Sequence, residues 1–301
     1  MQFRSRYKMA VLASTVATAG VAVSAIALQG GPADAAPRSG RSTNAAAGGH
    51  GSPSIAVGEP DPSARSDPSA ESQAGQPTAA RRYHWGRPKA GDDFRGSRLN
   101  KSNWAIYQGD HPQKRRASAV TVHGGKLRIT GRPGGVTGGV AWMKGAQKTG
   151  RWEARVRLNR SCACYNANLL LWPVHGGGGS SPNGGGGEID YMETYGDNGL
   201  RKGTNFFLHY GPEHNAKRLN AHVKVDLTNF HAFAVEWNAR GITGFVDGRR
   251  WFHTGNRKAL PPGPMGQAIQ LDWFPQLRSA PGVNKRQAAV LEVDWIRMYR
   301  P

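Results

Sequence analysis

Three carboxylates stand close together in the segment GGGGEIDYMETY, which covers residues 184–195. They are Glu188, Asp190 and Glu193, and their neighbours are large apolar and aromatic residues, unlike those of a solvated acidic tract. In a β-strand, residues two apart share a face, so Glu188 and Asp190 point the same way and Glu193 would point the opposite way. A β-bulge at residues 191–192 absorbs one residue and returns Glu193 to the face of the other two. The sequence therefore predicts three acids in a row on one face of a bulged strand.

Carboxylates in such a row can hydrolyse a glycosidic bond. Retaining glycosidases use two carboxyl groups about 5–5.5 Å apart, one as nucleophile and one as acid/base. A third carboxylate between them holds their pKa values apart, because neighbouring like charges cannot all ionise. The acids alone also fit an acidic edge strand or a calcium site. The segment NANLLLWP, residues 166–173, favours hydrolysis, because it predicts an adjacent strand that ends in Trp172, an aromatic platform beside the acids.

Strand signals dominate the rest of the chain, and no convincing amphipathic helix of about ten residues is found. Apolar and polar residues alternate, or nearly so, in the segments 118–122, 126–130, 151–158 and 232–237, and a long final strand is predicted over 289–299. Turns rich in Gly separate the strands, and residues 123–125 and 247–249 predict two β-hairpins. Many short strands at regular spacing predict two packed antiparallel sheets, a sandwich or jelly roll.

Composition divides the chain into three parts. Residues 1–35 have a basic start, an apolar run from Met9 to Leu28 and a small-x-small site at 33–35, which predicts a cleaved signal peptide, with a membrane anchor as the alternative. Residues 36–82 are rich in Ala, Gly, Ser and Pro and predict a disordered linker, because they cannot bury enough apolar surface to offset their ordering entropy. Residues 83–301 then form one predicted domain of all-β sandwich size.

The run GEIDYMETYG, residues 187–196, resembles the active-site signature of glycoside hydrolase family 16 in its bulged E-x-D-x-x-E form, as found in laminarinases, agarases and κ-carrageenases. Supporting segments stand in the family's order: TGRWEARVRL (149–158), LWP (171–173), FHAFAVEW (230–237), GITGFVDG (241–248) and VDWIRMY (293–299). The likeness covers residues from about 90 to 300. The resemblance implies a concanavalin-type β-jelly-roll sandwich whose concave face forms the sugar cleft.

The resemblance also implies roles for individual residues. Glu188 matches the nucleophile, Asp190 the carboxylate that hydrogen-bonds to it and tunes it, and Glu193 the acid/base. Trp172 matches an aromatic residue that stacks on the sugar beside the scissile bond. His209 matches a histidine near the acid/base, although a structural histidine would look the same in sequence.

Four further positions are candidates with less support from the sequence. Gln270 and Trp273 fall near a segment that lines the cleft, although their spacing departs from the usual form. Trp142 is the one candidate cleft residue among several tryptophans expected in the core. Asp294 matches a residue that helps to hold a structural calcium in many members, and it fits an ordinary strand Asp equally well.

Charge and cysteine content leave several properties open. The predicted domain carries 32 Lys and Arg against 15 Asp and Glu, an excess of 17 positive charges that favours anionic partners or serves solubility alone. Cys162 and Cys164 are the only cysteines. Buried thiols are the preferred prediction, because partners two apart on a strand are near the limit of disulfide span, and a strained bridge is the alternative. A metal site from them is disfavoured, because no second Cys or His pair has zinc-ligand spacing.

Together these features predict a secreted, monomeric, retaining endo-glycosidase acting on β-1,3- or mixed β-1,3/1,4-glucan and requiring no cofactor. The expected partner is the polysaccharide substrate, with no nucleic acid and no stable membrane association after signal cleavage. One alternative is hydrolysis of an anionic galactan or another acidic polysaccharide, which the positive charge suggests. A second alternative is a non-catalytic glucan-binding protein, which the presence of both glutamates disfavours.

Overall fold

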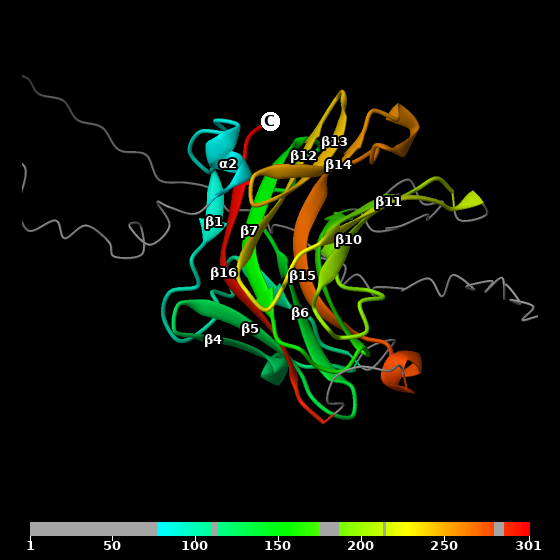
Figure 1. Ribbon diagram of the computed structural model, residues 1–301. Coiled ribbons are helices and arrows are strands. Elements are labelled where there is room, and N and C mark those ends of the chain that lie inside the picture. Colours follow the sequence, from blue (N-terminus) through cyan, green and yellow to red (C-terminus); the bar gives the residue numbers. More distant parts are fainter. Residues whose placement is uncertain (1–76, 110–113, 175–186, 213–214, 280–285) are drawn as a thin grey trace, which may run out of the picture. The chain divides into compact units, whose positions relative to one another are not determined.

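The computed structural model describes residues 77–109, 114–174, 187–212, 215–279 and 286–301, which form a domain built almost entirely of β-strands (Figure 1). The predicted signal peptide and residues 36–76 of the predicted linker lie outside the described residues. Nowhere in the described ranges is a helix long and apolar enough to cross a membrane.

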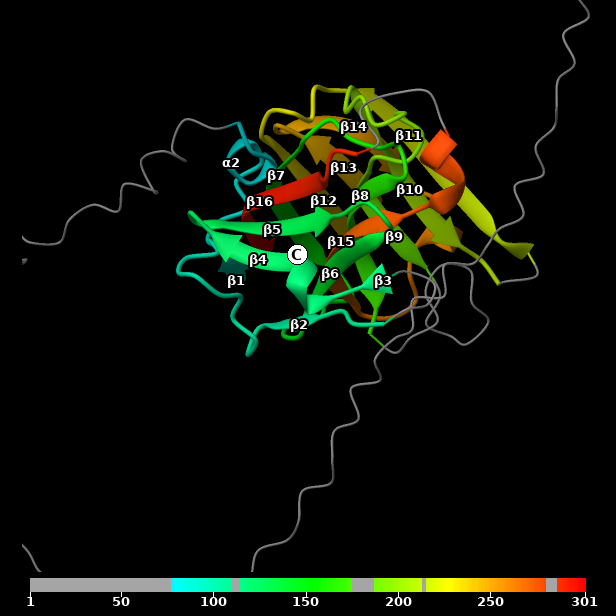
Figure 2. The same cartoon turned by 90° about the horizontal axis from the view of Figure 1, so that it is seen from below.

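The strands pair into two sheets that pack face to face, which confirms the predicted all-β jelly-roll sandwich (Figure 1 and Figure 2). The outer sheet has the order β14 (Arg249–Thr254), β13 (Gly241–Val246), β12 (His231–Asn238), β7 (Gly150–Leu158), β16 (Ala289–Tyr299), β5 (Lys126–Gly131) and β4 (Val120–His123), with β1 (Ala90–Asp92) paired to β16. The inner sheet has the order β11 (Lys217–Lys224), β10 (Gly203–Tyr210), β9 (Glu188–Glu193), β8 (Tyr165–Pro173), β15 (Met265–Trp273), β6 (Val136–Trp142) and β2 (Trp104–Ile106). The two-residue strand β3 (Lys114–Arg115) pairs with β6 in parallel, whereas the other pairs are antiparallel.

The hydrophobic core lies between the sheets, because each strand sends alternate side chains inward. In β8, Ala167, Leu169 and Leu171 enter the core, so the even-numbered residues of this strand face the other side of the inner sheet. Stacked rings of Phe206 from β10 and Phe252 from β14, 3.9 Å apart, join the sheets near one edge. The face of the inner sheet that points away from this core is called the outward face. Polar side chains can lie there, and this face carries the site.

Both predicted hairpin turns are present. Gly124 and Gly125 join β4 to β5 with φ angles of 59° and 68°, in the left-handed region that glycine adopts readily. Asp247 and Gly248 join β13 to β14 with φ angles of 47° and 70°, as a two-residue hairpin loop requires. Short 3-10 helices in connecting segments cover Ala117–Ala119, Arg257–Ala259 and Pro275–Ser279.

The end of the predicted linker forms part of the domain, so the boundary predicted at residue 83 is placed too late. The short helix α2 (Ala79–Arg82) lies against the outer sheet, and its Ala79 is fully buried. The carboxylate of Glu153 in β7 accepts the backbone N–H groups of Ala79 (2.6 Å) and Ala80 (3.2 Å). Ala79 and Trp85 pack with Ala234, Phe245 and Tyr299 in a second, small hydrophobic cluster. The Glu153 side chain and this cluster hold a segment whose composition resembles that of a linker.

The two cysteines form a disulfide, so the preferred prediction of free thiols is wrong and the alternative holds. They lie in a turn before β8 and not within a strand, with their Cα atoms 5.1 Å apart. The same turn is held by Arg201, whose buried guanidinium donates to the Ser161 hydroxyl and to the Tyr165 carbonyl oxygen. Arg201 thereby ties the loop before β8 to the loop that follows β9.

Candidate active site

Strand β9 carries the three acids, and its pairing changes register between Asp190 and Glu193. Glu193 stands opposite Asn168 of β8, and Asp190 stands opposite Leu170. Between these two pairs, β9 therefore contains one residue more than β8. The pairing of β9 with β10 shows the same shift. Because directly opposite residues share a face, Asp190 and Glu193 lie on one side of the sheet. The predicted bulge at residues 191–192 is confirmed.

The bulge is stabilised by its own two residues, which both point into the core. Met192 and Tyr191 are fully buried between the sheets. The Tyr191 hydroxyl donates a hydrogen bond of 2.9 Å to the Gln267 side-chain oxygen, which satisfies its polar group in the interior. Two consecutive inward side chains break the alternation of the strand, and this break returns Glu193 to the outward face.

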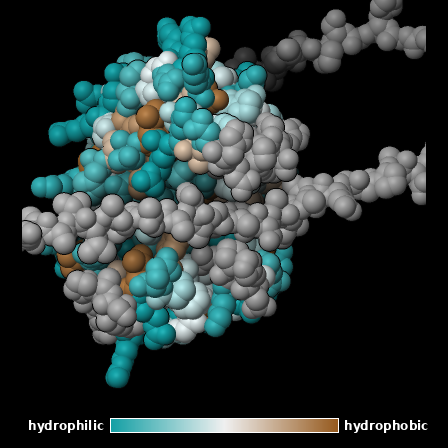
Figure 3. All heavy atoms as spheres, turned by 90° about the vertical axis from the view of Figure 1, so that its right-hand side faces the viewer, coloured by the Kyte–Doolittle hydropathy of each residue, from teal (hydrophilic) through white to brown (hydrophobic). Residues whose placement is uncertain are grey.

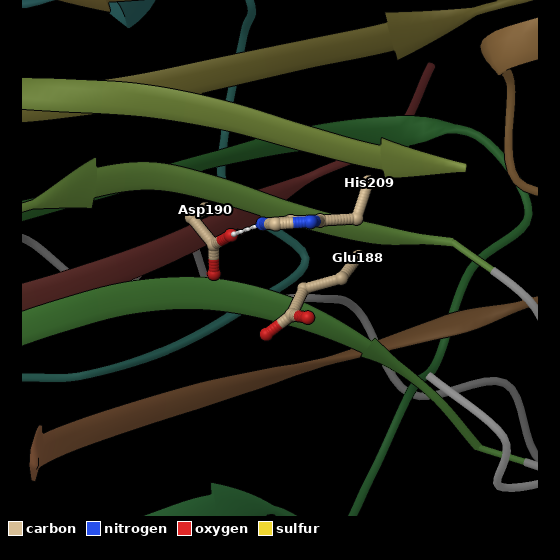
Figure 4. A group of neighbouring side chains, drawn as sticks. All are labelled: Glu188, Asp190 and His209. Atoms are coloured by element: carbon tan, nitrogen blue, oxygen red, sulfur yellow. Dashed lines mark ion pairs between the residues drawn. The ribbon is translucent and has the colours of Figure 1, made fainter. Parts of the chain in front are cut away.

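Asp190 is the centre of the polar group and is held from both sides. Asn168 of β8 donates to Asp190 Oδ1 at 2.8 Å, and His209 Nε2 of β10 lies 3.4 Å from Asp190 Oδ2. Figure 4 shows the His209 ring reaching from β10 to Asp190, with the Glu188 carboxyl group beside them. One ligand-type atom each from Glu188, Asp190 and His209 lies within 4.8 Å of the others. His209 therefore lies at the acids, but beside Asp190 and opposite Glu188; the residue opposite Glu193, near which His209 was predicted, is Asn205.

The surroundings raise the pKa of both glutamates. Burial raises the pKa of Glu188 well above its usual value, and the charges of Asp190 and Glu193 and a hydrogen bond with Asp190 raise it further. Burial also raises the pKa of Glu193, together with the charges of Asp190 and Asp272, while Arg218 opposes this shift. Like charges in a desolvated site cannot all ionise, so the group titrates as a unit and retains a proton above the ordinary range of a carboxyl group.

Of the predicted substrate-binding residues, Trp172 and Gln270 lie on the face of the acids. Trp172 is four residues after Asn168 in the regular strand β8, so it shares the outward face, and its side chain is partly exposed. Gln270 of β15 stands directly opposite Asn168. Trp172, Asn168 and Gln270 thus extend the polar face from the acids across β8 to β15.

Trp142 and Trp273 lie on the wrong face to bind substrate there, so these two predictions are wrong. Trp142 stands opposite the buried Trp104, with ring centroids 5.0 Å apart in an edge-on contact, and packs against the core. Trp273 is three residues after Gln270, which places it on the opposite face of β15, and it also packs against the core. The pairing of β15 with β8 shows no register shift, and residues three apart on such a regular strand point to opposite faces.

A fourth carboxylate and an arginine at the site are absent from the predicted set. Asp272 of β15 shares the outward face with Gln270, which donates to Asp272 Oδ2 at 2.8 Å. Arg115 of β3 donates to Asp272 Oδ1 at 2.5 Å, and both side chains are almost fully buried. The Arg115 guanidinium also lies 5.0 Å from the ring centroid of Tyr107.

Space for this arrangement comes from Gly139 of β6. A Cβ atom at Gly139 would lie 2.5 Å from the Tyr107 ring. Glycine at this position therefore leaves room for the ring over which the Arg115 guanidinium lies. The sequence signal for Asp272 is its spacing of two from Gln270. Arg115 offers no comparable signal, because a two-residue strand has no periodicity to detect.

Asp294 is paired with an arginine, so the structure does not support its prediction as a calcium ligand. Its Oδ2 accepts a bond of 2.6 Å from Arg155, and a guanidinium at this position opposes a bound cation. In the described part of the chain, the acids and histidine that come close enough to share a metal are Glu188, Asp190 and His209, which the site already uses.

Comparison with known proteins identifies the family. Residues 103–296, about two thirds of the chain, match the model of Glycosyl hydrolases family 16. The chain belongs to this family. It is therefore a glycoside hydrolase acting on O-glycosyl bonds, and the matched residues fall within the predicted domain 83–301. No curated protein shows a significant match to the chain.

Solved structures share the fold of this glycoside hydrolase at low identity. LamAcat from Zobellia galactanivorans is 17% identical with a TM-score of 0.61, over 72% of this chain and 99% of that chain. The endo-β-1,3-glucanase from Pyrococcus furiosus is 19% identical with a TM-score of 0.61, over 71% and 94%. The laminarinase from Rhodothermus marinus is 23% identical with a TM-score of 0.61, over 71% and 97%.

Proposed function

We propose that this glycoside hydrolase is a secreted, retaining endo-glycosidase that cleaves β-1,3- or mixed β-1,3/1,4-glucan by double displacement. The observation that carries the proposal is the bulge in β9, which sets Glu188, Asp190 and Glu193 on one outward face. Electrostatic coupling supports a joint catalytic role for the three acids, since the charge of Asp190 raises the pKa of both Glu188 and Glu193.

In the first step, the Glu193 carboxyl group donates its proton to the glycosidic oxygen. The Glu188 carboxylate attacks the anomeric carbon, the carbon–oxygen bond breaks, and the leaving sugar departs with its new hydroxyl group. In the second step, the Glu193 carboxylate removes a proton from water, and the water oxygen attacks the anomeric carbon. The bond to Glu188 then breaks, which restores both side chains.

The neighbours of the two glutamates have supporting roles in this scheme. The charge of Asp190 raises the pKa of Glu188, and Asn168 and His209 hold the two carboxylate oxygens of Asp190 in place. Burial keeps Glu193 protonated above the usual range of a glutamic acid, as a general acid requires. Both glutamates have raised pKa values, so the two roles are assigned from their order in the motif and not from titration.

The choice of glucan is supported by the fold and by the platform of Trp172. Solved structures with this fold are named as an endo-β-1,3-glucanase and as a laminarinase, and one from Bacteroides ovatus is named as a mixed-linkage glucan enzyme bound to an oligosaccharide product. An indole on the outward face near the acids can stack on the apolar face of a sugar ring. Secretion rests on the predicted signal peptide, and the monomeric state stays a prediction.

A reducing-sugar assay tests the proposal. Wild-type protein and Glu188→Gln are incubated with laminarin, mixed-linkage glucan, agarose and carrageenan. We expect wild-type activity on laminarin or mixed-linkage glucan and none for Glu188→Gln, because no covalent route remains. Activity confined to agarose and carrageenan would refute the proposal that the substrate is a β-glucan. Binding of these polysaccharides by the wild type without any hydrolysis would refute the proposed catalytic activity.

A further inference from the structure

Strand β11 is the edge strand of the inner sheet beside β10, and its outward residues are basic or polar. Its alternation sends Leu219, Ala221 and Val223 toward the core, so Arg218, Asn220, His222 and Lys224 share the outward face with the acids. In register, Arg218 stands opposite His209, the histidine that contacts Asp190. We call Arg218, His222 and Lys224 the basic strip.

Two members of the basic strip are held over β10 in the direction of β9. The Arg218 guanidinium lies 4.7 Å from the ring centroid of Phe207, which is buried on the outward face of β10. His222 Nδ1 donates to Asn205 Oδ1 at 3.1 Å. A Cβ atom at Gly203 would lie 2.6 Å from the His222 ring, so glycine leaves the space in which this ring lies across β10. The basic strip is thus built against the strand next to the catalytic one.

In the described part of the chain, the residues of the basic strip form no ion pair, in contrast to the arginines of the outer sheet. On the outer sheet, Glu292, Glu236 and Asp294 pair with arginines of β5 and β7. Across the described ranges, no carboxylate lies within ion-pair distance of Arg218, His222 or Lys224. The basic strip therefore presents two exposed cations, Arg218 and Lys224, that form no ion pair in these ranges.

The outward side chains of β11 are exposed. Figure 3 shows the right-hand side of Figure 1, and the described residues visible there are predominantly hydrophilic, with small hydrophobic patches. Arg218 is close enough to Glu193 for its charge to act on that carboxyl group. A chain whose scissile bond lies at Glu193 and which continues across β10 must pass the basic strip.

We propose that the basic strip binds anionic substituents on the sugar residues that leave the catalytic face over β10 and β11. The inference rests on the proposed function and narrows its substrate class to a β-1,3- or mixed-linkage glucan that carries carboxylate or sulfate groups. Arg218 offers a planar pair of donors that fits a carboxylate or a sulfate, and Lys224 adds a point charge further along the strand. In the bound polysaccharide, the uncharged sugars at the scissile bond contact Trp172 and the acids, and the anionic substituents further along the chain contact the basic strip.

Binding by the full chain with Glu188→Gln tests the strip without turnover. The ligands are one β-1,3-glucan in three forms: unmodified, lightly carboxymethylated and lightly sulfated. Dissociation constants are measured by calorimetry at low and high salt. We expect both anionic forms to bind about tenfold more tightly than the unmodified glucan at low salt, which corresponds to ~1.4 kcal/mol. This advantage disappears at high salt, because exposed charges are screened.

Matched variants locate the effect. Replacing Arg218, His222 and Lys224 by Gln should reduce the anionic forms to the affinity of the unmodified glucan. The control replaces Arg249 and Arg250 by Gln, since both are exposed on β14, the edge strand of the outer sheet, and we expect it to keep the full preference. A gain with only one of the two anions identifies the substituent that the strip accepts.

Two results would overturn the proposal. One is equal affinity for all three forms, and the other is a preference that survives the strip variant or is lost equally in the control. Failure of the proposed function is a separate result: wild-type protein would hydrolyse none of the three forms, while the binding preference and its dependence on the strip would persist.

Discussion

Replacing Glu153 by Gln should change how the stability of the fold depends on pH. Glu153 is fully buried in β7, and burial raises its pKa to about 7 from a usual 4.5, although the N–H groups of Ala79 and Ala80 favour its charged form. Between these two values, the folded protein binds more protons than the unfolded chain, so stability falls as pH rises. A difference of about 2.5 pH units corresponds to ~3 kcal/mol, present below the unfolded pKa and lost as pH passes the folded one.

Urea unfolding followed by tryptophan fluorescence at several pH values from about 5 to 8 measures this effect. We expect the free energy of unfolding of the wild type to fall by about 2.5 kcal/mol relative to Glu153→Gln over this range, because at pH 5 the carboxyl group of the unfolded chain is already mostly ionised. The control is Glu236→Gln on the adjacent strand β12, which should keep the wild-type slope. Parallel curves for the wild type and Glu153→Gln would refute the reasoning, because the buried carboxylate would then titrate as it does in the unfolded chain.

The remaining predictions concern the site. Trp172→Ala should fold normally by circular dichroism and lose about tenfold or more in kcat/KM on laminarin through lost stacking, and unchanged kinetics would contradict this. Gly139→Ala should lower the free energy of unfolding by ~1–3 kcal/mol, because its Cβ would displace the Tyr107 ring, and an unchanged urea midpoint would show that the ring has room to move. The alkaline limb of the pH–kcat profile should lie above the ordinary range of glutamic acid, because burial raises the pKa of Glu193, and an alkaline limb at the usual value would refute its role as the acid.

The odd spacing within the acid motif was enough to predict the central feature of the site. Glu193 is five residues after Glu188, so only a bulge could place both on one face, and the register of β9 shows that bulge. Alternation also held enough information to reject Trp273, which is three residues after Gln270 and must face the core. The resemblance to the family suggested Trp273 as a cleft residue, although the spacing of three from Gln270 already places the two side chains on opposite faces of a regular strand.

Other features depend on contacts between distant segments, which local patterns do not show. Arg115 reaches Asp272 over 157 positions of sequence, through a strand of two residues. The segment at Ala79 resembles linker by composition, and its anchor is Glu153, a residue 74 positions away. Cys162 and Cys164 lie in a turn, where the span limit expected for a strand does not apply.

The stereochemistry of the first product tests the central claim most directly, because it depends on the two roles given to Glu188 and Glu193. Proton NMR follows the anomeric signals during the first minutes of laminarin hydrolysis, before the new reducing ends equilibrate. The double displacement predicts that the β-anomer appears first and that the α-anomer grows only later by mutarotation. If the α-anomer appears first, the retaining mechanism and the roles assigned to Glu188 and Glu193 are contradicted.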